Sequence, residues 1–471
     1  MNLIWLAGKA FLIALILTPI VRDTFRSYNM VDRPGHRKVH AYPIPRVGGI
    51  AIAIAYAVAL IPGLGTENES SAVLWKLLPG ASLVFLTGLV DDFFPLKPIL
   101  KIAGLVAAAS VVFWNGLHIG DLATQALPVW LDYPLTVFWL LLTSNALNLI
   151  DGLDGLCAGM GLMATLTLFA AALLHHNQPL AAATFPLAGA LLGFLCYNIS
   201  PATVFLGDSG ALVIGFLLGC YGMIWTQKSA TLLSMLVPLL AISIPLLDVS
   251  LSVVRRFLRN QPIFGADRRH IHHRLLDRGF SARQAVWVLY LFAALMASLA
   301  LLSSSPLGGR FQGFIIGLFC LAAWIGVRQL RYSEFDIAGQ FLFGGGFKRA
   351  LDGRLKLERM TVELEQSTDE DSWWTALVEG AFSLGMAEVR WTGQYGTRVK
   401  TAASPLVTPS WCFQVSVTDT EVIEVRGVFP KASDTFDLIG FAETVTRTFQ
   451  AKCVAPKAEI QKAETTVTAA I

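Results

Sequence analysis

Long apolar runs dominate the first 330 residues of the chain, and short polar segments separate them. A helix needs about 20 mostly apolar residues to cross a bilayer, and eleven runs approach that length. They lie at about 2–21, 47–64, 76–94, 99–117, 128–146, 158–176, 180–198, 209–226, 231–251, 285–304 and 311–328. The first run lacks a basic leader and a small-residue cleavage site, so we expect a retained span rather than a signal peptide. This pattern predicts a mainly α, polytopic membrane protein with about eleven transmembrane helices.

The pattern changes after Arg331 to that of an ordinary soluble sequence. Amphipathic helices are expected near 353–367 and 372–385, three strands at 387–392, 411–417 and 421–429, and a last helix near 435–452. We therefore divide the chain into a transmembrane domain (1–330), a linker (331–352), a small α+β domain (353–454) whose role the sequence does not indicate, and a disordered tail (455–471).

Composition agrees with a membrane protein and narrows its partners. Hydrophobic residues make up 54% of the chain and charged residues 15%, whereas soluble domains carry about 25% charged residues. The net charge of +3 is small, and no Lys/Arg run is interleaved with aromatic residues, so a nucleic-acid partner is not expected. The six cysteines show no CxxC or Cys/His spacing typical of zinc sites.

Positive charge is distributed unevenly among the loops, and this predicts the orientation of the chain. The loop after the first run carries six Lys or Arg residues and the loop after the ninth carries eight, while the even-numbered loops have almost none. Because Lys and Arg concentrate in cytoplasmic loops, we expect the N-terminus outside and the C-terminal domain in the cytosol. The protein is predicted to reside in the inner (cytoplasmic) membrane, with its active site facing the cytoplasm.

Acidic residues fall at the predicted cytoplasmic borders of the apolar runs. Asp91 and Asp92 end the third run, Asp151 and Asp154 follow the fifth, and Asp208 precedes the eighth. Ionisable groups at membrane depth are costly and usually mark a site. Taken alone, the Asp91-Asp92 pair could be a solvated helix end and Asp208 an ordinary helix N-cap.

Two further polar motifs lie on the same predicted face. Asn145, Asn148, Asp151 and Asp154 follow at intervals of three, which places neighbours on one face of a helix. The segment Arg268-Arg-His-Ile-His-His-Arg is dense in groups that bind diphosphates, although a basic loop at lipid headgroups is the alternative. Acids that bind Mg²⁺, together with cations that bind phosphate, are what phosphoryl transfer requires.

Together these motifs resemble the polyprenyl-phosphate N-acetylhexosamine-1-phosphate transferase family (glycosyltransferase 4 type). The resemblance extends from about residue 30 to residue 328. Its matching stretches are Arg33-Pro-Gly-His-Arg-Lys-Val-His, Pro45-Arg-Val-Gly-Gly, Asp91-Asp92, Asn145 to Gly155, Phe205 to Gly210, and His270-Ile-His-His-Arg.

The resemblance implies a role for each matching residue. It implies a Mg²⁺ ion, with Mn²⁺ as the alternative, bound directly by Asp208, with Asp91 and Asp92 against the metal or the acceptor phosphate. The catalytic set would be Asp91, Asp92, Asp208, His272 and His273. Substrate would also be bound by Asn145, Asn148, Asp151 and Asp154 on the nucleotide side, by His270, His272, His273 and Arg274 at the diphosphate, and by Lys38, Arg46 and Lys101.

The reaction implied is transfer of a sugar 1-phosphate from a UDP-sugar to a polyprenyl phosphate, with release of UMP. The His-Ile-His-His-Arg form resembles the branch that uses UDP-N-acetylglucosamine, while a UDP-MurNAc-pentapeptide transferase is the alternative within the family. A transporter with a cytosolic regulatory domain is an alternative of another class, and it predicts acids near the bilayer midplane. A membrane-anchored signalling protein would leave the four motifs unexplained, and a homodimer stays open.

Overall fold

The chain divides into two units, Met1–Tyr332 and Ser333–Ile471. The computed structural model describes residues 2–32, 43–65, 68–122, 127–227, 235–258, 270–305, 308–329, 346–393, 396–402, 411–418, 420–427 and 438–451. Lys38, Arg268, Arg269, the predicted tail and most of the predicted linker lie outside these ranges. Each unit is described by itself.

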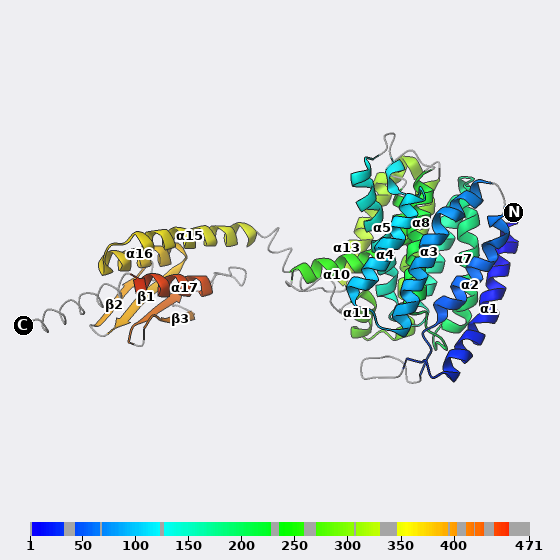
Figure 1. Cartoon of the computed structure of the whole chain (residues 1–471). Coiled ribbons are helices and arrows are strands. Elements are labelled where there is room, and N and C mark those ends of the chain that lie inside the picture. The colour runs from blue at the N-terminus through cyan, green and yellow to red at the C-terminus, as the bar shows by residue number, and fades with distance from the viewer. Residues whose placement is uncertain are drawn as a thin grey trace, which may run out of the picture. The chain divides into compact units, whose positions relative to one another are not determined.

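The first unit is a bundle of helices (Figure 1). Its elements are α1 (Leu3–Ser27), α2 (Gly48–Leu64), α3 (Glu69–Phe93), α4 (Pro98–Trp114), η1 (Ile119–Leu122), α5 (Val129–Ile150), α6 (Leu156–Leu174), α7 (Gln178–Asn198), α8 (Gly207–Gln227), α9 (Leu236–Ala241), α10 (Ser243–Leu258), α11 (Ile271–Asp277), α12 (Ala282–Ser304) and α13 (Gly308–Gln329). Seven of the described helices are long and apolar enough to cross a membrane: α1, α3, α5, α6, α7, α8 and α12. Shorter apolar helices lie at Gly48–Leu64, Pro98–Trp114 and Phe311–Gly326. The helical membrane domain is therefore confirmed, whereas the count of eleven crossings is not.

The ninth predicted span is not one helix. The described part of this run forms α9 and α10, which are separated at Ile242. Pro245 has no N–H to donate to the carbonyl of Ala241, and its ring would clash with that carbonyl in a continuous helix. The prediction of a single helix over 231–251 is therefore wrong, and α10 projects sideways from the bundle (Figure 1).

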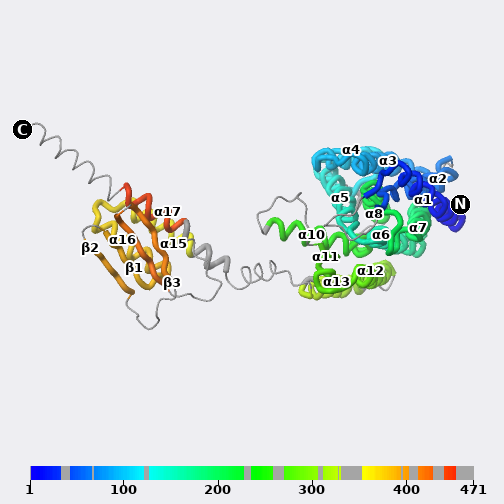
Figure 2. The backbone as a smooth tube through the Cα atoms, turned by 90° about the horizontal axis from the view of Figure 1, so that it is seen from below, coloured from blue at the N-terminus to red at the C-terminus, as the bar shows by residue number. Residues whose placement is uncertain are grey.

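Helix α8 lies in the middle of the bundle (Figure 2) and is the most completely buried of the long helices. Its first turn touches α2 at Gly49 and α3 at Gly88. A side chain at Gly49 would overlap Ser209 and Gly210, and one at Gly88 would overlap the backbone at Ser209. These glycines let the backbones approach closely, which brings the end of α3 against the start of α8.

The second unit contains α15 (Gly346–Gln366), α16 (Glu370–Ser383), β1 (Met386–Gly393), β2 (Gly396–Thr401), β3 (Trp411–Ser416), β4 (Val422–Gly427) and α17 (Leu438–Phe449). The strands form an antiparallel sheet in the order β2-β1-β4-β3. We predicted three strands and missed β2, because every residue of that strand is exposed and it shows no alternation of apolar side chains.

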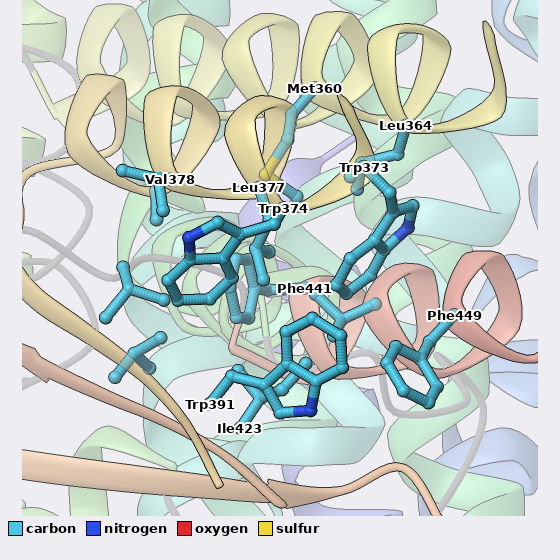
Figure 3. Close-up of a cluster of buried hydrophobic side chains, with 14 of the residues drawn as sticks. Met360, Leu364, Trp373, Trp374, Leu377, Val378, Trp391, Ile423, Phe441 and Phe449 are labelled. Carbon is cyan, nitrogen blue, oxygen red and sulfur yellow. The ribbon is translucent and has the colours of Figure 1, made fainter. Parts of the chain in front are cut away.

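The helices of this unit pack on one face of the sheet around buried aromatic residues. Trp373, Trp391 and Phe449 meet edge to face with ring centroids 5.2–6.1 Å apart (Figure 3). The opposite face carries charges that pair with one another. Arg390 lies 3.1 Å from Glu388, and Arg426 lies 2.6 Å from Glu424. Because its side chains are charged, this face is suited to contact with water.

Candidate active site

Asp92 anchors the first turn of α8 to the end of α3. Its carboxylate accepts hydrogen bonds from the backbone N–H of Asp208 (2.7 Å), the N–H of Ser209 (3.0 Å) and the Ser209 hydroxyl (2.6 Å). Gly207 has φ +77°, and a side chain there would come within 2.8 Å of the same carboxylate. Glycine satisfies both the backbone conformation and the close approach. Asp92 therefore fixes the position of its neighbour in the site, Asp208.

Asp91 and Asp208 converge on the ammonium group of Lys101, which α4 supplies. Lys101 Nζ lies 3.1 Å from Asp91 Oδ2 and also contacts the carboxylate of Asp208. The other oxygen of Asp91 accepts the N–H of Leu96 at 2.7 Å. Helices α3, α4 and α8 thus bring two carboxylates and one ammonium group into contact.

The segment that precedes α2 pairs with the segment that precedes α8. Arg46 and Phe205 form a parallel bridge, and the N–H of Gly48 donates to the carbonyl of Phe205 at 2.9 Å. This pairing brings the Pro45-Arg-Val-Gly-Gly and Phe205-to-Gly210 motifs together. Arg46 Nε lies 3.5 Å from Asp32.

The loop between α5 and α6 is held by three side chains. Asp154 accepts the N–H of Ala202 at 3.0 Å, and the Asn198 carboxamide accepts the N–H of Gly155 at 3.1 Å. Tyr290 of α12 donates its hydroxyl to the carbonyl of Gly155 at 2.6 Å. The N–H and the carbonyl of Gly155 are thus both hydrogen-bonded, and this fixes the backbone path of the loop that begins at Asp151.

Asp151 lies in an environment that disfavours its charge. Burial and then the neighbouring carboxylate of Asp208 raise the pKa of Asp151 to about 7, with Asp92 and Asp154 acting in the same direction. A cation bound nearby would reverse this effect. A cation at this side of the site would therefore stabilise the charged form of Asp151.

The histidine segment approaches this loop from the other side. His272 is 1% exposed, and a side chain at Gly152 would overlap its Nε2. Among the described residues, neither ring nitrogen of His272 has a hydrogen-bond partner. Burial and the adjacent His273 lower the pKa of His272 to about 3. Burial thus favours the uncharged imidazole of His272, and both of its ring nitrogens are buried without a hydrogen-bond partner among the described residues.

His270 precedes α11 and is held by a residue that we did not predict. Its Nδ1 lies 3.0 Å from Asp248 Oδ2, and its ring stacks on that of His272 with centroids 5.8 Å apart. His273 and Arg274 follow on the same helix. The sequence marks Asp248 as a single acid within the ninth apolar run, and Asn198 as a polar residue at the end of the seventh. Nothing in the sequence distinguishes Tyr290 from other aromatic residues of the apolar runs.

The structure thus brings most of the predicted site residues to one end of the bundle. Asn145 donates its amide to Leu141 of its own helix at 2.8 Å, and Asn148 is half-buried near the end of α5. Within the described ranges, no three His, Cys, Asp or Glu side chains are grouped closely enough to hold a metal ion. The roles of the individual residues, including Asp91, Asp92 and Asp208 as metal ligands, stay predictions.

Comparison with known proteins gives a consistent set of relatives. Residues 74–226 match the model of glycosyl transferase family 4. The chain is 35% identical over 318 residues to a probable undecaprenyl-phosphate N-acetylglucosaminyl 1-phosphate transferase of Bacillus subtilis, covering 66% of this chain and 88% of the relative. It is 34% identical over 321 residues to a decaprenyl-phosphate N-acetylglucosaminephosphotransferase of Mycolicibacterium smegmatis (61% and 79%). An undecaprenyl-phosphate alpha-N-acetylglucosaminyl 1-phosphate transferase of Escherichia coli K12 is 30% identical over 306 residues (62% and 82%).

Proposed function

The chain belongs to glycosyl transferase family 4, and we propose that it transfers N-acetylglucosamine 1-phosphate from UDP-N-acetylglucosamine to undecaprenyl phosphate, releasing UMP. The observation that carries this proposal is the meeting of two polar clusters at one end of the bundle. Asp91 and Asp208 contact Lys101 in the first cluster. In the second, the buried imidazole of His272 lies against Gly152, in the loop that begins at Asp151. The relatives named for N-acetylglucosamine favour that sugar over a MurNAc-pentapeptide.

The position of the acids also argues against a transporter. Asp91 and Asp92 lie in the last turn of α3 and Asp208 in the first turn of α8. Acids that serve transport are expected near the bilayer midplane, where helices are interrupted. We place this end of the bundle at the cytoplasmic face of the inner membrane, since it adjoins the two strongly basic loops. In the proposed topology the chain crosses the membrane for the ninth time through the broken α9–α10 segment and not through one continuous helix.

The proposed mechanism depends on charge and position rather than on a strong base. The acceptor is a phosphomonoester with a second pKa of about 6, so its attacking oxygen is already ionised at neutral pH. Lys101 and the His272–Arg274 segment are placed to bind phosphate oxygens, and Asp151 and Asp154 lie on the nucleotide side. These side chains would hold the diphosphate in line with the attacking oxygen.

A divalent metal fits the oxygen donors of this site. Asp91 and Asp208 both contact the ammonium group of Lys101, so a cation in its place would meet two carboxylates. Both oxygens of Asp92 instead accept hydrogen bonds from the start of α8. Hard carboxylate oxygens suit Mg²⁺ or Mn²⁺, and we propose Asp91 and Asp208 as the ligands. When bound, the ion would neutralise the negative charge of the diphosphate.

Purified full-length protein with Mg²⁺, undecaprenyl phosphate and a panel of UDP-sugars tests the proposal, with UMP release as the readout. We expect release with UDP-N-acetylglucosamine, its loss on adding a chelator, and its return with Mg²⁺ or Mn²⁺. No release with any sugar would overturn the transferase function. Labelled UMP should not exchange into UDP-sugar without lipid, because we propose a single displacement. Rapid exchange would instead indicate a covalent enzyme intermediate.

An apolar cleft supports a lipid acceptor. It measures about 260 Å³ and lies between α10, α11, α12 and α13, with Ile271 and Leu275 of the histidine helix in its wall. Phe292→Ala would remove apolar contact from the cleft and is expected to raise the KM for undecaprenyl phosphate by about tenfold. The KM for the UDP-sugar should stay unchanged, and an equal rise in both would refute this placement of the prenyl chain.

Tyr290→Phe tests the loop that holds Asp151. The substitution keeps the ring in place against Gly159 and removes only the hydrogen bond to Gly155. We expect kcat/KM for the UDP-sugar to fall by about tenfold, since one hydrogen bond is worth about 1 kcal/mol and the loop also loses its alignment. Tyr133→Phe is the matched control, because it removes a tyrosine hydrogen bond to Ser110 far from the site. Equal activity of the two variants would count against the role of Tyr290.

A further inference from the structure

Asp248 is a buried acid that the mechanism above does not use. It lies on α10 and is 2% exposed. Its Oδ2 lies 3.0 Å from Nδ1 of His270, and its Oδ1 accepts the N–H of Ile271 at 2.7 Å. One carboxylate therefore binds both the ring and the backbone at the point where α11 begins.

These two contacts determine more than the position of one ring. The contact with Asp248 Oδ2 holds Nδ1 of His270 toward α10, so the orientation of the His270 ring is fixed. The backbone contact at Ile271 sets where the first turn of α11 starts. The rings of His270 and His272 are parallel within 5°, and the His272 ring lies against Gly152. Contacts thus run without a gap from α10 to the loop of Asp151.

From this chain of contacts we propose that Asp248 is a positioning residue for the transfer reaction, which it serves through His270 by holding the histidine helix in register with the active-site loop. The inference rests on the proposed function. It predicts that Asp248 affects turnover without touching either substrate. It also gives a role to a buried acid on α10, the helix that projects from the bundle.

A second buried aspartate beside a histidine lies at the start of α5, at the end of that helix remote from the site. Asp132 is 3% exposed, accepts the N–H of Gly120 at 2.7 Å and lies 2.7 Å from Nδ1 of His118. It stands in the first turn of α5, whereas Asp151 follows the last. Asp132→Asn therefore makes the same chemical change in another buried aspartate that lies beside a histidine and accepts a backbone N–H, at a place where no catalytic effect is expected.

The experiment compares Asp248→Asn with Asp132→Asn in the full-length protein, after wild-type UMP release has been established. We expect Asp248→Asn to lower kcat by about 10- to 100-fold, the scale on which the outer partners of metal-binding histidines affect activity. The KM for undecaprenyl phosphate and the thermal unfolding midpoint should match those of Asp132→Asn. Active wild type with equal kcat in the two variants would overturn the inference and leave the proposed function standing. Inactive wild type would overturn the proposed function itself.

A double-mutant cycle separates positioning from a general loss of structure. If Asp248 acts through His270, Asp248→Asn should cost little further activity in a His270→Gln background. Full additivity of the two losses would contradict the proposal. Should Asp248→Asn not accumulate, Asp248→Glu keeps the charge but shifts the carboxylate by about 1.5 Å. The same loss of kcat is then expected, and wild-type kcat in that variant would overturn the inference.

Discussion

Asp208→Asn is expected to lower kcat by about a thousandfold and to leave the folded protein as stable as the wild type. Asn keeps the size of the side chain, and the N–H of residue 208 still donates to Asp92. What disappears is one of the two negative charges that contact the ammonium group of Lys101. A group that organises charge in a phosphoryl-transfer site contributes on this scale.

Steady-state UMP release and thermal unfolding of the purified variant in detergent check this expectation. If Asp208 is a direct ligand, the variant should also need a higher Mg²⁺ concentration for half-maximal activity, because loss of the charged oxygen weakens binding of the ion. Near-normal kcat in Asp208→Asn would remove this residue from the proposed metal site. An unfolding midpoint well below that of the wild type would show that the carboxylate serves mainly to hold the fold.

Asp92→Ala is expected to reduce both stability and activity, whereas Asp208→Asn is expected to reduce activity alone. The variant leaves the N–H groups of Asp208 and Ser209 without their acceptor at the start of the most buried helix. Each buried donor left unpaired costs about 1–3 kcal/mol, so we expect a loss of about 3 kcal/mol and a clear fall in the unfolding midpoint. Activity should fall about 100-fold as Asp208 loses its fixed position.

Asp92→Asn provides the graded control, since it keeps one acceptor oxygen and should give an intermediate loss in both measurements. The two properties should change together across the pair of variants. A large fall in kcat with an unchanged unfolding midpoint would mean that Asp92 acts on substrate or metal directly. The assignment of its carboxylate to α8 would then be wrong.

Hydropathy alone located most of the helices of the first unit. The run at 180–198 became Gln178–Asn198, and the run at 47–64 became Gly48–Leu64. The break at Ile242 was within reach of the sequence, because Pro238 and Pro245 flank it, but the continuous apolar composition outweighed that signal. β2 could not be found in this way, since its stability comes from backbone pairing with β1 and not from buried side chains.

For the site, the sequence predicts which motifs gather but not what each side chain contacts. Asp91 and Asp92 are adjacent in sequence and were assigned one role, yet one faces Lys101 and the other binds the backbone of α8. That division depends on where α8 meets α3, which the glycines at 49 and 88 determine through tertiary contact. His270 was predicted as a substrate ligand, whereas the acid that orients it lies 22 residues earlier on another helix.

The bond between Asp92 and the start of α8 also has a consequence for biosynthesis. Its donors are 116 and 117 residues further along the chain. At about 5–20 residues per second, a ribosome needs roughly 6 to 23 s to deliver them after Asp92 has emerged. During that interval the carboxylate of Asp92 lacks the donors that it has in the folded protein. The proposed catalytic centre is therefore incomplete in every nascent chain until the start of α8 has been synthesised, and a truncated product that stops before Asp208 lacks it.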